Sequence, residues 1–69
     1  MRANAVLDYV RDVAAHGDRV FAATLLAQAL VVQEYDQWRA IELAVDYLNL
    51  TDVEIDAVLT RWRADNETE

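Results

Sequence analysis

The residues that break helices are almost missing from this chain, and their scarcity limits what it can fold into. In 69 residues there is one Gly and no Pro. Ala and Leu, which favour helices, are abundant, and no long stretch alternates apolar and polar residues as a half-buried strand would. The sequence therefore predicts an all-α fold, a compact bundle of short helices joined by short loops.

The length of the chain predicts a single domain. We expect this helical domain to cover residues 1–64, and residues 65–69 to form a solvated acidic tail. A domain of this size has a small core and marginal stability.

Two helices are predicted in the first half of the chain. Apolar residues recur at helical spacing between Asn4 and His16, and Gly17 can adopt the left-handed conformation that ends such a helix. Asp18 can then cap a second helix, which extends to Val32 or Gln33.

Two further helices are predicted in the second half. Asp36 is a possible N-cap for a helix over residues 37–48. The alternative is one long helix from Asp18 to Asn49, which would leave three helices in the bundle. Thr51 and Glu54 fit a capping box at the start of the last helix, which we expect to fray after Arg63.

The second helix poses a packing problem because its apolar side chains point in every direction. At 100° per residue, Phe21 falls on one side, Leu26 and Leu30 on another, and Ala27 on a third. A helix that is apolar all round is normally buried on all sides, and three short neighbours can hardly cover it. We therefore expect a homodimer that forms through Phe21, Leu26 and Leu30, or a second protein that covers this helix.

The net charge of −7 is concentrated in the middle of the chain. Residues 34–56 hold seven acidic residues and one Arg, whereas residues 1–33 are balanced. Such a patch attracts a basic protein surface and repels nucleic-acid phosphates. We expect a partner to contact four of these acids and two apolar residues of the third helix: Glu42, Asp46, Asp52, Asp56, Leu43 and Tyr47. Leu43 and Tyr47 are also candidate contacts for self-association. The alternative is that the acids favour helix starts or only aid solubility.

No pattern typical of an enzyme or a metal site is present in the sequence. The chain has no Cys and one His, which excludes thiolate metal sites. His16 has only Asp12, four residues earlier, as a neighbour for acid–base or metal chemistry, and its place at a helix end explains it equally well. We therefore expect no catalytic residues, no metal and no cofactor.

The sequence also predicts a cytoplasmic protein. The longest apolar run, Val20–Val32, is shorter than the about 20 residues that a membrane-spanning helix needs. The first residues lack the features of a signal peptide.

These features favour a small, non-enzymatic, acidic helical protein that binds and regulates or inhibits a larger protein. The alternative is a small helical DNA-binding transcriptional regulator that uses Arg61, Arg63 and Arg39. Glu42 and Asp46 argue against it, because they would repel the phosphates that such a helix approaches. A third hypothesis is an enzyme subunit that completes a shared site with His16 and Asp12.

Overall fold

The computed structural model describes residues 3–67, and its elements confirm the all-α prediction. The four helices are α1 (Ala3–Ala15), α2 (Arg19–Val32), α3 (Gln37–Leu48) and α4 (Asp52–Glu67). Within this described range the chain has no strand. Side chains are described for residues 5–65.

The turn between α1 and α2 has the residues that the sequence predicts for it. Gly17 has a φ of +96°, in the left-handed region where a side chain would strain the backbone. The Asp18 carboxylate accepts a hydrogen bond from the backbone N–H of Phe21, 3.1 Å away, and so caps α2.

Asp36 separates α2 from α3, as predicted, and the alternative of one long helix is wrong. Its carboxylate Oδ2 accepts hydrogen bonds from the backbone N–H groups of Trp38 at 3.1 Å and Arg39 at 3.3 Å. Before it, Glu34 has a φ of 73°, so the chain turns through a left-handed residue directly after α2 ends.

The capping box at the start of α4 is confirmed. Glu54 N–H donates to Thr51 Oγ1 at 3.3 Å, and Thr51 N–H donates to Glu54 Oε1 at 2.9 Å. The predicted end of this helix is wrong, because α4 continues past Arg63 to Glu67. No Gly or Pro follows Arg63 to stop the helix, so the expected tail is helical over 65–67. Residues 68 and 69 lie outside the described residues.

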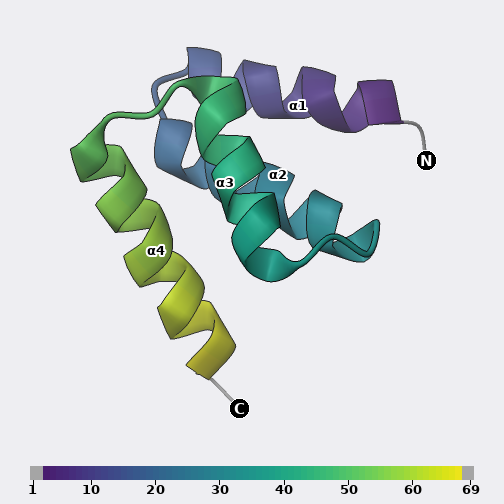
Figure 1. Ribbon diagram of the computed structural model, residues 1–69. Helices are drawn as coiled ribbons and strands as arrows, with labels where there is room; N and C mark the ends of the chain where they lie inside the picture. The colour runs from purple at the N-terminus through teal and green to yellow at the C-terminus, as the bar shows by residue number, and fades with distance from the viewer. Residues whose placement is uncertain (1–2, 68–69) are drawn as a thin grey trace.

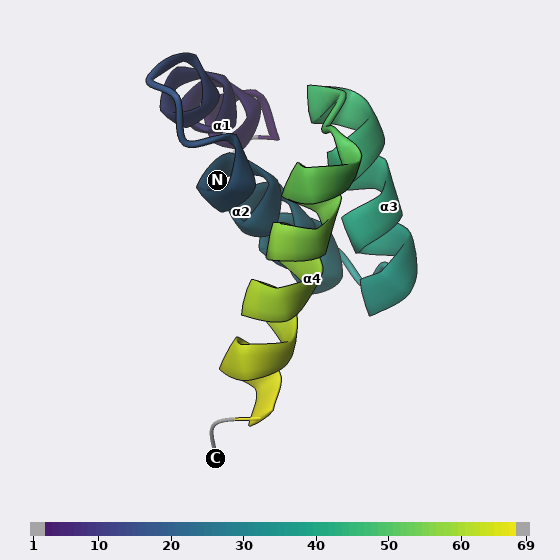
Figure 2. The same ribbon diagram turned by 90° about the vertical axis from the view of Figure 1, so that its left-hand side faces the viewer.

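α2 lies at the centre of the molecule, and the other three helices pack around it (Figures 1 and 2). The closest packing uses small side chains. Five alanines of α2 and α3 are fully buried: Ala22, Ala23, Ala27, Ala40 and Ala44. Val58 and Trp62 of α4 and Val10 of α1 complete the core together with Leu26, Ile41 and Leu50.

The other three helices cover more of α2 than its apolar pattern suggests. Alanine side chains need little cover, and they let the neighbouring helices come close. The apolar side chains of α2 that stay exposed, Val31 and Val32, lie in its last turn. One chain therefore covers most of its central helix, although Phe21, Leu25 and Leu30 are only half-buried. Self-association itself stays a prediction.

Two polar contacts hold α4 in place. At the start of α4, the Arg19 guanidinium of α2 donates to both carboxylate oxygens of Glu54, at 2.8 and 3.0 Å, and to the carbonyl of Asn49 at 2.8 Å. Further along α4, Trp62 Nε1 donates to the side-chain oxygen of Gln37 at 3.2 Å, which ties α4 to the start of α3.

Candidate functional site

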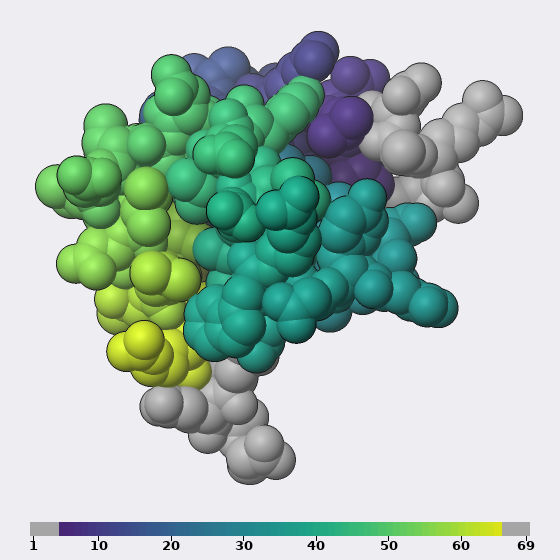
Figure 3. Space-filling model, viewed as in Figure 1, coloured from purple at the N-terminus to yellow at the C-terminus, as the bar shows by residue number. Residues whose placement is uncertain are grey.

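An open groove runs between α3 and α4. Both helices pack against α2 but only marginally against each other, and a hollow of about 590 Å³ remains between them. Figure 3 shows the face of the molecule on which the two helices lie side by side. The groove is lined by Asp36, Trp38, Arg39, Ile41, Glu42, Val45, Ile55 and Leu59.

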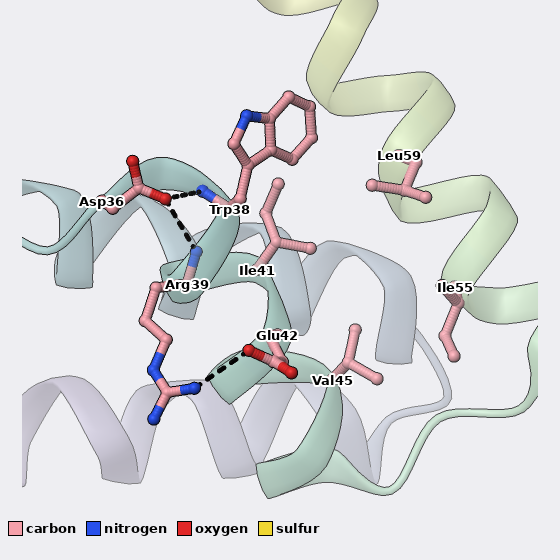
Figure 4. A pocket seen from close by; sticks show the side chains of 8 residues that line it. All are labelled: Asp36, Trp38, Arg39, Ile41, Glu42, Val45, Ile55 and Leu59. Atoms are coloured by element: carbon pink, nitrogen blue, oxygen red, sulfur yellow. Dashed lines mark hydrogen bonds and ion pairs between the residues drawn. The ribbon is translucent and has the colours of Figure 1, made fainter.

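The walls of the groove are apolar. Figure 4 shows Ile41 and Val45 of α3 across from Ile55 and Leu59 of α4, with the ring of Trp38 at one end. Ile41 is buried, whereas the other three aliphatic side chains are half-buried. Trp38 is 56% exposed. An indole and several aliphatic side chains therefore meet solvent along one continuous hollow.

The rim of the groove on α3 is polar. Arg39 Nη1 lies 3.1 Å from Glu42 Oε1, and both side chains are exposed. An exposed pair of this kind contributes little to stability, so either group can exchange its partner at small cost. Asp36 lies at the end of the groove, where its carboxylate caps α3.

The four acids predicted to contact a partner lie along the two helices that form the groove. Glu42 lines it, and the exposed Asp46 follows one turn later on α3. Asp52 and Asp56 are exposed on α4. Asp52 precedes Ile55 by three residues and Asp56 precedes Leu59 by three, which places both acids beside the α4 wall.

Glu54 belongs to the same run of acids in the sequence but has a different role in the structure. Its hydrogen bonds from Arg19 and, next in importance, from Thr51 lower the pKa of the Glu54 carboxyl to about 2. The same pairing raises the pKa of Arg19. Glu54 therefore holds α4 to α2 and does not belong to the rim of the groove.

Leu43 and Tyr47, the two apolar residues predicted to contact a partner, lie on the side of α3 that reaches α1. The Tyr47 hydroxyl accepts a hydrogen bond from Arg11 Nε of α1 at 2.8 Å, and the guanidinium lies 5.8 Å from the ring centre. Leu43 precedes Tyr47 by four residues on the same helical side and is half-buried. Their contact with a partner stays a prediction.

The three residues predicted for self-association lie in three different environments. Leu26 is 5% exposed and belongs to the core. Phe21 is half-buried, and the Arg61 guanidinium lies 5.0 Å from its ring centre. Leu30 lines a second, smaller groove between α1 and α2, of about 270 Å³, together with Val6, Leu7 and Tyr35.

The arginines of the DNA-binding alternative point to different parts of the molecule. Arg61 lies over Phe21 of α2, and Arg39 pairs with Glu42 on α3. Arg63 follows Arg61 by two residues, a spacing that puts two side chains on different sides of a helix. The fold does not gather these cations into one basic surface.

His16 and Asp12 form a local contact at the end of α1. His16 Nδ1 donates to the Asp12 carbonyl at 2.7 Å and lies 3.8 Å from its carboxylate, and both side chains are exposed. Among the described residues no group of three or more His, Asp or Glu side chains could hold a metal ion. No helix in that part of the chain is both long and apolar enough to cross a bilayer.

Helical spacing alone does not reveal the groove, because it places the residues of the groove walls on apolar stripes that would normally form a core. Trp38, Ile41 and Val45 share one apolar stripe of α3, and Ile55 and Leu59 share another on α4. A signal was available in the alanines. Ala40 and Ala44 form a small, fully buried face of α3. Because this face packs on α2, the larger apolar residues of α3 beside it can face the groove instead.

Comparison of the chain with models of protein families, with curated proteins and with solved structures gave no match. The site must therefore be interpreted from its own residues.

Proposed function

We propose that this chain is a non-enzymatic interaction module, which binds a larger protein in the groove between α3 and α4 and thereby regulates or inhibits it. The observation that carries the proposal is the groove itself, an apolar hollow of about 590 Å³ that ends on an exposed Trp. A small domain has few apolar side chains to spare, and contiguous exposed apolar surface typically marks an interaction site. Trp residues are enriched among those that dominate binding energy.

The size of the molecule supports a role that depends on binding. The helices fill a volume of only 29 × 26 × 20 Å, so an occupied groove would place most of α3 and α4 against the partner. A protein that covers a functional surface of its partner inhibits it, and one that stabilises a conformation of the partner regulates it.

Trp38→Ala is the variant that tests this proposal. Trp38 is largely exposed, so its removal should leave the fold intact while it weakens binding by at least about 2 kcal/mol, as at other aromatic residues that dominate binding energy. Proteins captured from the native host by the wild-type chain and by the variant would be compared by quantitative mass spectrometry. We expect a protein that the wild type retains and the variant loses.

Tyr9→Ala is the matched control, because Tyr9 is an aromatic residue of α1 with 57% exposure, close to that of Trp38. It should retain the partner. If both variants retain every captured protein, or both lose the same one, the groove is not the binding site. Far-UV circular dichroism of each variant shows whether its helices remain formed.

A further inference from the structure

We propose that the groove binds a basic amphipathic α-helix of its partner. The inference rests on the function proposed above and adds the chemistry of the ligand. It depends on three observations: the shape of the groove, the spacing of its apolar side chains, and the sign of the charges around it.

The shape of the groove favours a helix over an extended peptide. An extended β-segment binds by pairing with the edge of a sheet, and residues 3–67 offer no strand for such pairing. A polyproline segment docks in a groove lined by aromatic rings, whereas the lining here is mainly aliphatic. The walls here are two helices that each present a stripe of apolar side chains, Ile41 and Val45 on α3 and Ile55 and Leu59 on α4. A third helix laid between them would pack its own apolar stripe against both.

The length of the groove sets the length of this ligand. The α3 residues that line it run from Trp38 to Val45, which span about 10 Å at the helical rise, or about two turns of a bound helix. Apolar residues of the ligand at i, i+3, i+4 and i+7 would follow the groove over that distance. The Trp38 ring stands at one end (Figure 4), where it can cover the terminal apolar residue.

The charges around the groove determine which charged residues can flank the apolar stripe of the ligand. The carboxylates on the two helices, at the groove or beside it, belong to five residues: Asp36, Glu42, Asp46, Asp52 and Asp56. Arg39 lies among them, already paired with Glu42, and Arg63 follows Leu59 by one turn. Lys or Arg residues that flank the apolar stripe of a ligand would meet these acids, whereas acidic flanks would be repelled.

Three designed helical peptides of about three turns test the inference. They share one stripe of Leu residues and differ in the flanking positions, which are all Lys and Arg, all Glu, or equal numbers of Lys and Glu. Binding is followed by the fluorescence of Trp38, whose emission should shift to the blue when a peptide covers it. The other indole, Trp62, is 7% exposed and should not respond. Trp38→Phe should therefore remove the shift.

We expect the basic peptide to bind at least about tenfold more tightly than the acidic one, and its affinity to fall as salt is added. The double variant Glu42→Lys with Asp56→Lys should weaken the basic peptide by at least about tenfold and strengthen the acidic one. Asp8→Lys with Asp12→Lys, two exposed acids of α1, is the matched control and should change little. If the double variant fails to fold, Glu42→Gln with Asp56→Asn gives the same test with a smaller effect.

Two results would overturn the inference in distinguishable ways. Equal affinity for all three peptides, unchanged by charge reversal, would show that the groove binds apolar helices without regard to charge; the proposed function would then stand and the basic ligand would not. No response of Trp38 to any peptide, together with a partner that Trp38→Ala still retains, would end both proposals.

Discussion

At the scale of single residues, the ion pair of Arg19 and Glu54 shows how a polar contact can position a whole helix. Each partner is held by more than one hydrogen bond, and the three residues involved come from the start of α2, the end of α3 and the start of α4. The same Glu54 carboxylate closes the capping box. One side chain therefore both starts α4 and fixes where it lies.

This pair predicts a pH dependence of stability. The pKa of Glu54 is lowered from 4.5 to about 2 by folding. A group whose pKa falls on folding stabilises the protein above its unfolded pKa, and the benefit is lost as the pH falls toward the folded value. We expect the free energy of unfolding to decrease between about pH 5 and pH 2, and Glu54→Gln to reduce this decrease.

Urea unfolding of the wild type and of Glu54→Gln at a series of pH values provides the measurement. Asp56→Asn is the control, because it removes an exposed carboxylate from the same helix without touching Arg19. Parallel pH profiles for the wild type and Glu54→Gln would contradict the role assigned to the pair.

At the scale of helices, the alanines decide how α2 and α3 meet. Ala40 and Ala44 of α3 are fully buried, as are Ala22, Ala23 and Ala27 of α2. Side chains of this size allow a short distance between helix axes, and a larger residue at any of these positions would push the helices apart.

Ala44→Leu should therefore destabilise the protein by about 1–3 kcal/mol, the range seen when extra methylene groups are forced into a packed core. Ala57→Leu is the matched control, since Ala57 is exposed on α4 and its replacement should change stability by less than about 0.5 kcal/mol. Urea denaturation followed by circular dichroism gives both values. Equal effects at the two sites would show that the α2–α3 contact tolerates separation.

At the scale of the whole molecule, one chain covers most of its central helix. The apolar side chains of α2 that remain exposed, Val31 and Val32, lie in its last turn. Folding should therefore not depend on a second copy. The predicted homodimer, if it forms, would join molecules that are already folded.

The thermal midpoint of unfolding should accordingly stay constant over about a hundredfold range of protein concentration in which the chain is monomeric, because only association of folded copies would stabilise the folded state by mass action. Differential scanning calorimetry or circular dichroism at several concentrations measures it. A midpoint that rises with concentration would mean that folding is coupled to self-association. Sedimentation of the same samples would then give the oligomeric state.

The boundaries of most elements could be predicted from the sequence because they depend on neighbouring residues. Gly17, Asp18, Asp36 and Thr51 each act on backbone groups within three residues of themselves, and such signals are visible in the chain. The end of α4 was misjudged for the same reason: no residue there stops the helix, so the sequence offers no signal to read.

The groove between α3 and α4, by contrast, was decided only by the tertiary structure. Helical spacing indicates that Trp38, Val45 and Leu59 lie on apolar sides of their helices, but it does not say whether another helix comes close enough to cover them. That distance depends on how α1, α3 and α4 are arranged on the surface of α2. It also depends on the buried alanines, which allow α3 to pack close to α2. The sequence by itself determined the helices and their charges. The packing of all four together decided which apolar side chains became core and which were left to line a groove.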